Sequence, residues 1–228
     1  MNAFLNSFLD FLLPRFCFEC SDKLLPGEYL FCAECLPEIP RVPPDRLAIE
    51  FERKFLGEEI ISGFTSLFLF EKDGSIQKVI HEMKYQNSFN IGKTLGRIAG
   101  EELFEKAAEW NADMIIPVPI HSLRRADRGY NQSLYIAKGI GEMLFLPVKS
   151  GIVKRGKYTA TQTTLNLNER KENVADAFTV KKNTPVKGKR IILIDDVITT
   201  GATITECAKA LLNAGAVKVF AISVALAE

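Results

Sequence analysis

The sequence predicts an α/β protein in which helices flank a parallel sheet, with a small cysteine-rich module at the N-terminus. Two observations carry this prediction. After residue 60, short apolar runs alternate with amphipathic segments, which is typical of βαβ units. Before residue 36, four of the five cysteines lie close together. The length of 228 residues suits one α/β domain with an appended module, and 47% hydrophobic and 25% charged residues are globular values. We expect the module over residues 1–45 and the α/β domain over 46–228.

The first residues are apolar but lack the features of a secretion signal. They have no basic stretch, Asp10 interrupts the run, and Pro14-Arg15 follows without a small-residue cleavage site. About ten apolar positions are also too few to span a bilayer. The apolar residues fall at helical spacing, which favours packing on the core or a partner. A cytoplasmic protein without a membrane span is therefore expected.

The clustered cysteines form two C-x₂-C pairs, Cys17/Cys20 and Cys32/Cys35, separated by eleven residues. This is the spacing of a zinc ribbon, in which four thiolates complete a tetrahedron around one structural Zn²⁺. Two redox disulfides are the alternative, which the lack of a secretion signal disfavours. Short strands are expected over residues 23–25 and 28–31, joined by the turn at Pro26-Gly27. Residues 17–35 carry four acidic side chains and one lysine, so the module should repel nucleic acid.

The rest of the chain is divided by turn residues into strands and helices. Residues 36–58 are rich in proline and charge and are interpreted as a linker. Apolar runs predict the strands, and apolar side chains at helical spacing behind Ser, Asp, Asn or Gly predict the helices. In chain order we expect a strand over 64–70, helices over 75–85 and 91–109, a strand over 114–118, a helix over 131–146, strands over 148–153, 178–181 and 190–194, a helix over 202–213, and a final strand over 217–226.

The most informative stretch is RIILIDDVITTGAT, residues 190–203. An apolar strand is followed by Asp195-Asp196, a hydroxyl-rich turn and a helix that begins near Ala202. Backbone N–H groups and the positive end of that helix suit a phosphate, and the two carboxylates suit a ribose diol, directly or through metal-bound water. An ordinary βα turn with a chance acidic pair is the alternative. The string resembles the phosphoribosyl-pyrophosphate (PRPP) signature of type I phosphoribosyltransferases. In that resemblance Asp195 and Asp196 are the catalytic acids, and the phosphate contacts come from Val197, Thr199, Thr200, Gly201, Ala202 and Thr203.

A second candidate segment is IIPVPIHSLRRADRGYNQS, residues 115–133. A strand ends there, and a basic loop leads into the next helix. Ligands of parallel sheets bind beyond the carboxyl ends of the strands, where this loop and Asp195 are both expected. Arginine forks suit diphosphate oxygens, whereas the histidine is equally well explained as a plain loop residue. The predicted pyrophosphate loop comprises Pro119, His121, Arg124, Arg125 and Arg128.

Formal charge is distributed unevenly along the chain, although the total is only +1. Residues 1–120 hold 12 basic and 19 acidic side chains, which is −7, and residues 191–228 hold 2 and 4, which is −2. Residues 121–190 hold 15 and 5, which is +10. A polyanion lying over this middle segment is one interpretation, and a solvated basic face is the other.

These motifs together resemble the ComF family (ComFC and GntX-like proteins). Besides the cysteine pairs and the PRPP signature, the string PVP-x-H…RGYNQ matches over 117–132, and T-x-x-Q-x-x-L…R-x-x-N-V-x-x-A-F matches over 159–178. Ser122 departs from the proline that these proteins often carry. The resemblance implies a type I phosphoribosyltransferase-like core with a zinc-ribbon module. It also points to Lys84 at a helix end, and to Arg155, Gln162, Arg170 and Asn173 in a flexible loop.

Three functions follow as expectations. The resemblance implies a cytoplasmic protein that handles single-stranded DNA in natural transformation, with competence proteins as partners. The second is an enzyme that transfers phosphoribose from PRPP, with Mg²⁺, to a nitrogen acceptor that no motif identifies, residues 154–173 forming its lid. The third is a PRPP sensor without turnover.

Overall fold

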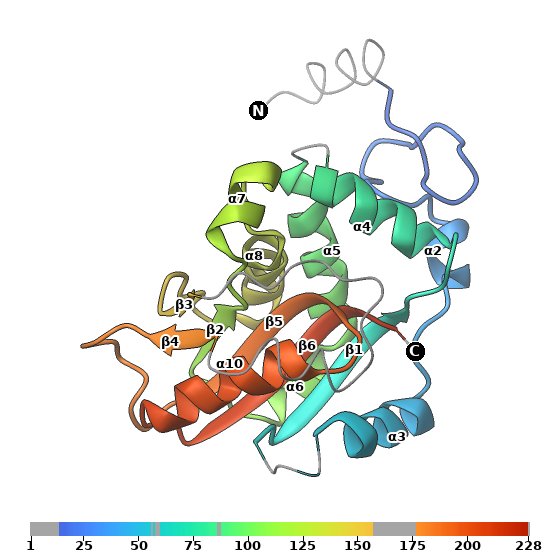
Figure 1. Cartoon of the computed structure of the whole chain (residues 1–228). Helices are drawn as coiled ribbons and strands as arrows, with labels where there is room; N and C mark the ends of the chain where they lie inside the picture. The colour runs from blue at the N-terminus through green and yellow to red at the C-terminus, as the bar shows by residue number, and fades with distance from the viewer. Residues whose placement is uncertain (1–13, 56, 58–59, 86–87, 157–176, 228) are drawn as a thin grey trace.

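A four-stranded parallel sheet forms the centre of the computed structural model, which describes residues 14–227 apart from 56, 58–59, 86–87 and 157–176 (Figure 1). The strand order is β1-β6-β5-β2. These strands comprise Gly63–Leu69 (β1), Lys218–Leu226 (β6), Arg190–Ile198 (β5) and Met114–Pro117 (β2). The predicted parallel α/β sheet is therefore confirmed.

The two central strands of the sheet, β5 and β6, are apolar on both faces. Residues Ile191 to Ile194 of β5 are fully buried, and β6 is buried from Val219 onward. Helices cover both faces of a parallel sheet, so its inner strands are apolar on both sides rather than alternating. In register, Asp195 of β5 lies opposite Ser223 of β6, and Ile194 pairs with Pro117 of β2. The carboxyl ends of β5 and β2 therefore lie side by side.

One face of the sheet is covered by α4 (Ser75–Tyr85), α5 (Phe89–Glu102) and α8 (Gln132–Leu144). Helices α5 and α8 touch through their backbones. A Cβ on Gly96 would lie 2.1 Å from the Ile136 carbonyl oxygen, and one on Gly139 would lie 2.2 Å from that of Lys93. Only glycine permits such contact, so these two positions allow α5 and α8 to pack backbone to backbone.

The other face carries α10 (Ala202–Asn213) and α3 (Pro44–Phe55). The linker predicted over residues 36–58 is wrong, because α2 (Cys35–Glu38) and α3 occupy most of it. Proline at position 44 is the first residue of α3, where its missing N–H is not needed. Leu47, Phe51 and Phe55 then follow at four-residue spacing and pack on the sheet. The proline-rich composition favours a linker, whereas one of these prolines starts a helix.

Other element boundaries also differ from the predictions. The helix expected over 91–109 is two helices, α5 and α6 (Phe104–Ala108). The strand over 148–153 is reduced to an isolated bridge at Val148 and to β3 (Val153–Arg155), which pairs antiparallel with β4 (Phe178–Val180). Strand β5 runs on through the acidic pair to Ile198 instead of ending before it.

The N-terminal module packs directly on the α/β core. Cys17, Leu24, Leu30 and Phe31 are buried in the same apolar cluster as Phe68 of β1. The strands predicted over 23–25 and 28–31 are wrong, since residues 14–35 form no strand and only one bridge, from Phe16 to Lys23. The division at residue 45 stays a prediction. Within the described residues, no helix is both long and apolar enough to cross a bilayer.

Candidate functional site

The acidic pair lies in the last part of β5, just before the chain bends through residues 199–201 into α10. Both carboxylates are partly buried. Asp195 Oδ1 accepts hydrogen bonds from Ser133 Oγ at 3.0 Å and from the Asp196 backbone N–H at 2.9 Å. Asp196 Oδ1 accepts from the Val197 N–H at 2.8 Å. Each carboxylate thus accepts backbone or side-chain hydrogen bonds through its Oδ1 atom.

Lys84, at the end of α4, lies beside this pair. Its Nζ is 2.7 Å from Asp196 Oδ2, so it neutralises one of the two adjacent acids. Sequence analysis placed Lys84 in the site on family resemblance alone, and the structure brings it next to the acidic pair. Ser133, which is 2% exposed, was not identified as a site residue from the sequence, although it follows the matched RGYNQ string.

The two carboxyl groups differ in acidity. Burial, together with the charge of Asp196, raises the pKa of Asp195 to about 7. Burial also acts on Asp196, but the neighbouring Lys84 ammonium outweighs it and lowers the pKa of Asp196. At neutral pH the pair therefore consists of an ionised Asp196 and an Asp195 carboxyl group that is near the midpoint of its titration. Such a pair combines a hydrogen-bond acceptor with a potential proton acceptor.

The hydroxyl loop after β5 leads directly into the N-terminus of α10. Gly201 has φ +79°, a left-handed conformation, and precedes the first turn of α10. The Ala202 N–H contacts Thr200 Oγ1 at 3.4 Å, and Thr199 is exposed. The twelve-residue α10 directs its positive end at this loop.

The predicted pyrophosphate loop contains a helix, α7 (Ser122–Arg128), which the sequence analysis missed. His121 is its N-cap residue and accepts a hydrogen bond from the Leu123 N–H at 3.3 Å through Nδ1. Asn131 precedes α8 as predicted, but its Nδ2 donates to the Val118 carbonyl at 3.0 Å instead of capping the helix. Pro119 lies two residues beyond the end of β2, and Arg124 and Arg125 both belong to α7.

Two further arginines tie this loop to its surroundings. Arg128 donates to Gln132 Oε1 at 3.3 Å and lies over the Tyr85 ring at 6.0 Å. Arg155, at the end of β3, lies over the Phe178 ring at 5.4 Å. Its pKa is lowered by burial and by the charge of Arg124, while Asp195 opposes the shift. Arg155 therefore lies within electrostatic reach of both Arg124 and Asp195. Gln162, Arg170 and Asn173 lie outside the described residues.

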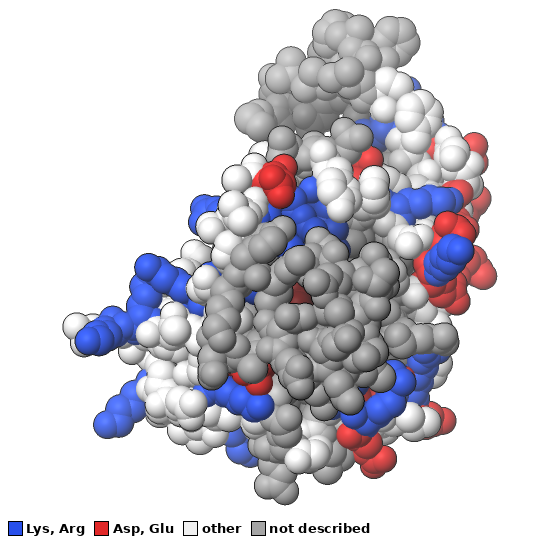
Figure 2. All heavy atoms as spheres, in the orientation of Figure 1, with Lys and Arg blue, Asp and Glu red and all other residues white. Residues whose placement is uncertain are grey.

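Lysine and arginine side chains line one margin of the face that bears the site. Figure 2 shows them at the left of the molecule, over the part of Figure 1 that carries β3, β4 and α7, with few acidic side chains among them. These elements belong to the +10 segment of the sequence. The basic charge of this segment therefore gathers at one margin of the molecule.

The four clustered cysteines meet the requirements of a zinc site. Their Sγ atoms all lie within 4.8 Å of one another, and those of Cys20 and Cys32 are 3.9 Å apart. Thiolates at about 2.3 Å from a tetrahedral Zn²⁺ lie about 3.8 Å from each other. For Cys17, backbone N–H groups outweigh the effect of burial and lower the thiol pKa to about 7. Cys207 is fully buried in the core, as expected.

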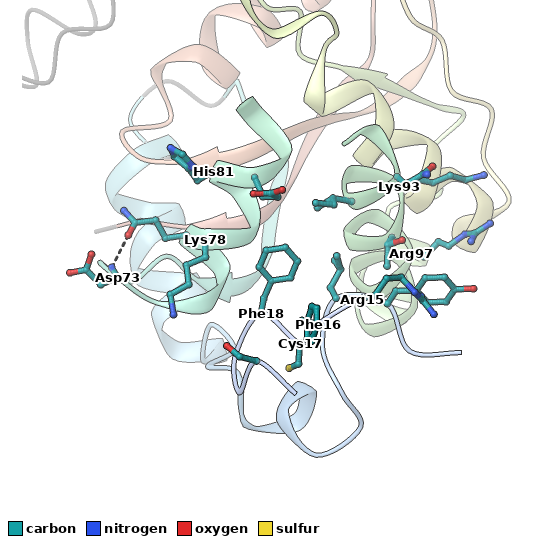
Figure 3. Close-up of a pocket in the computed structure, with 17 residues that line it drawn as sticks. Arg15, Phe16, Cys17, Phe18, Asp73, Lys78, His81, Lys93 and Arg97 are labelled. Atoms are coloured by element: carbon teal, nitrogen blue, oxygen red, sulfur yellow. Dashed lines mark hydrogen bonds between the residues drawn. The ribbon is translucent and has the colours of Figure 1, made fainter. Parts of the chain in front are cut away.

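A separate cavity of about 1350 Å³ lies between the cysteine pairs and helices α4 and α5. In Figure 3 Phe16, Cys17 and Phe18 line it on one side, with His81 of α4 and Arg97 of α5 on the others. None of the lining residues belongs to the acidic pair or the hydroxyl loop. This cavity is therefore distinct from the candidate site.

The fold and the site together define a phosphoribosyltransferase-type protein. Residues 83–227 match the phosphoribosyl transferase domain family, and the chain belongs to that family. The matched range contains Lys84, the basic loop and the acidic pair.

Curated relatives confirm the resemblance that the motifs indicated. The chain is 37% identical over 142 residues to "Competence protein F" of Haemophilus influenzae, covering 60% of this chain and 62% of that protein. It is 33% identical over 147 residues to "DNA utilization protein YhgH" of Escherichia coli K12, covering 63% and 64%. The chain thus spans somewhat over three fifths of the length of these relatives.

Among solved structures, the chain has weak similarity to the glutamine PRPP amidotransferase of B. subtilis. The identity is 24%, with 58% of this chain and 26% of that chain covered and a TM-score of 0.40. For the purine phosphoribosyltransferase of Pyrococcus horikoshii, the identity is 22%, the coverage 58% and 73%, and the TM-score 0.37.

Proposed function

We propose that the site at the carboxyl ends of β5 and β2 binds PRPP or a related sugar phosphate. The loop Thr199–Thr203 takes the 5′-phosphate, Asp195 and Asp196 take the ribose hydroxyls, and the segment from Pro119 to Arg128 takes the pyrophosphate. The observation that carries this proposal is the arrangement of the acidic pair. It is fixed by Ser133 and Lys84 from two separate helices and stands directly before the N-terminus of α10.

Two metals complete the proposal. Zn²⁺ on Cys17, Cys20, Cys32 and Cys35 is structural, because four protein ligands leave no position for a substrate. Mg²⁺ accompanies the pyrophosphate group of PRPP and supplies positive charge beside the arginines of α7.

For the cellular role, we infer cytoplasmic handling of single-stranded DNA during natural transformation, with competence proteins as partners. The names of the two relatives, competence protein F and DNA utilization protein YhgH, support this role, as does the basic margin of the molecule in Figure 2. A backbone of phosphates and pentoses offers the same chemical groups as the sugar phosphate. Tyr130 of the RGYNQ string is half-buried, and its hydroxyl donates a hydrogen bond to the Met83 carbonyl of α4.

The alternative is an active phosphoribosyltransferase, and the raised pKa of Asp195 favours it. In that reaction the bond from ribose C1 to pyrophosphate breaks, and a bond from C1 to a nitrogen acceptor forms. Asp195, near its midpoint at neutral pH, takes the proton that the acceptor loses. Arg124 and Arg125 stabilise the charge that develops on the leaving pyrophosphate.

Calorimetry of PRPP binding in the presence of Mg²⁺ tests the binding site. The double variant Asp195→Asn/Asp196→Asn should lose measurable binding, whereas Asp73→Asn, an exposed aspartate before α4, should bind as the wild type does. Retained affinity in the double variant would remove the assignment.

Two assays then separate the functions. Pyrophosphate release from PRPP, measured across nitrogen acceptors, reports turnover. Binding of a single-stranded oligonucleotide at several salt concentrations reports phosphate contacts, because each neutralised phosphate steepens the salt dependence. A steep slope without turnover favours the DNA-handling role, and turnover with a shallow slope favours the enzyme.

A further inference from the structure

Helix α3 touches the hydroxyl loop, although the sequence gives no sign that the two belong together. Lys54, in the last turn of α3, donates a hydrogen bond from Nζ to the Thr199 carbonyl oxygen across 145 positions in the chain. The next residue, Phe55, lies against Gly201, where an added Cβ would come within 2.7 Å of the phenyl ring. The end of α3 thus supports the loop at both of its sides.

Lys54 is held in place by its own partner. Its Nζ lies 2.9 Å from Glu50 Oε2, one helical turn earlier, and the side chains of Lys54 and Glu50 are only 4% and 9% exposed. Arg53 contacts the same carboxylate oxygen at 2.7 Å, but its side chain is 55% exposed. An ion pair this deeply buried persists only when its geometry and hydrogen bonds are satisfied. Lys54 is therefore a fixed donor beneath the loop rather than a mobile surface charge.

The direction of this hydrogen bond determines where the loop presents its own donors. A trans peptide is planar, so its carbonyl and its N–H point to opposite sides. The Thr199 carbonyl and the Thr200 N–H belong to one peptide group. With the carbonyl turned down to Lys54, the Thr200 N–H is turned away from α3. The cation also polarises this peptide, which strengthens the N–H as a donor.

We propose that Lys54, supported by Glu50, is a positioning residue for the phosphate loop. It fixes the Thr199–Thr200 peptide so that the loop offers its N–H groups, and not a carbonyl oxygen, to the 5′-phosphate. The inference rests on the proposed function for the identity of the ligand. The claim about the loop's geometry stands apart from that ligand and is tested without it.

Two variants on the same helix separate positioning from a general effect of charge. Lys54→Met keeps the length of the side chain and removes its donor. Arg53→Met removes the neighbouring cation and its contact with Glu50, while it leaves the loop contact intact. The first measurement is loop exchange, the amide hydrogen exchange of Ala202 and Thr205 in the ligand-free protein with its full chain. Their N–H groups donate to Thr200 Oγ1 and to the Gly201 carbonyl, so both amides report the conformation of the loop. Lys54→Met should raise exchange in the loop at least tenfold, and Arg53→Met should leave it at the wild-type level.

The second measurement is calorimetry with ribose 5-phosphate and, separately, with pyrophosphate and Mg²⁺. Lys54→Met should lower the affinity for ribose 5-phosphate about tenfold and leave the affinity for pyrophosphate unchanged, because pyrophosphate is assigned to a different loop. A variant that is merely destabilised would bind both ligands more weakly. If Lys54→Met does not fold, Lys54→Gln, which retains a donor without the charge, is measured with the same ligands and should give a smaller loss in the same direction.

The outcomes are distinct. Unchanged loop exchange in folded Lys54→Met, or in Lys54→Gln if it takes its place, overturns the positioning role, as does equal weakening of both ligands. If loop exchange rises but the wild-type protein binds neither ribose 5-phosphate nor PRPP, the positioning role stands and the proposed function fails.

Discussion

Lys84 Nζ and Asp196 Oδ2 lie 2.7 Å apart, which joins the end of α4 to the end of β5 through one ion pair. The two side chains are 22% and 14% exposed, so water screens the pair only in part. This contact explains how two adjacent carboxylates coexist. One is ionised beside a lysine, and the other, Asp195, has a raised pKa and accepts a hydrogen bond from Ser133. A sugar phosphate that enters the site meets both states.

Removal of this ion pair should destabilise the protein in a pH-dependent way. We expect Lys84→Met to lower the free energy of unfolding by about 1–3 kcal/mol at pH 7, because it leaves Asp196 beside Asp195 without its cation. Lys84 lowers the pKa of Asp196, so its contribution is fully present above the unfolded value of 3.8 and is lost as the pH falls from there through the lower pKa of the folded state. Urea unfolding at pH 7 and at about pH 3 measures this. Lys78→Met, at an exposed position of the same helix, is the control, and a similar loss in both variants would contradict the prediction.

Asp195→Asn should stabilise the free protein at high pH. The pKa of Asp195 is about 7 in the fold and 3.8 in the reference state. Between these values the folded state binds more protons than the unfolded state, so stability from this group falls as the pH rises. Asparagine keeps the acceptor for Ser133 and carries no charge. The variant should exceed the wild type by on the order of 2 kcal/mol near pH 8 and match it below about pH 4. A difference that is independent of pH would contradict the raised pKa.

Gly201→Ala should destabilise the protein by about 2–4 kcal/mol, for two reasons. The residue has φ +79°, and a Cβ would come within 2.7 Å of Phe55. Gly188→Ala provides the matched control, because φ is +74° there and no atom lies within 4 Å of the added Cβ. Backbone strain alone should cost this control about 1 kcal/mol. Equal losses in the two variants would show that the contact with α3 contributes nothing.

The cysteine cluster should hold about one zinc ion per chain, as we expect from its sulfur geometry. Cys17→Ser removes one ligand and should lose the metal, with a fall in thermal stability, because the binding free energy of a structural metal is part of the folding free energy. Elemental analysis of the purified protein measures the metal content. Cys207→Ala, a cysteine outside the cluster, should retain the zinc. A stably folded native protein without metal would refute the assignment.

The parallel sheet could be predicted because its evidence is local. Long apolar runs such as β5 and β6 can be buried only between two layers of helices, and the spacing of apolar residues identified α4 and α10. Helix α3 could not be predicted in the same way. Its amphipathic pattern lies in a proline-rich stretch, which favours a linker. The apolar face of α3 is explained only by its contact with the sheet, which it makes through Phe55.

The sequence indicated the segments of the candidate site, but not the contacts that join these segments to the rest of the fold. The order of residues from Asp195 to Thr203 carries local chemistry, and the sequence therefore indicated the acids and the loop. The contacts of Ser133 with Asp195 and of Lys54 with Thr199 join residues 62 and 145 positions apart. Such contacts depend on the crossing of helices and strands, which no local pattern encodes. Lys84 was predicted as a site residue only from the family resemblance, because the local sequence does not indicate its contact with Asp196.

A crystal structure of the full-length protein with ribose 5-phosphate tests the central claim most directly. The account predicts the phosphate at the N–H groups of Thr200–Thr203 and the ribose hydroxyls at Asp195 and Asp196. Binding of the compound in the cavity beside Phe16 and Arg97, with the hydroxyl loop blocked by the protein's own side chains, would contradict it.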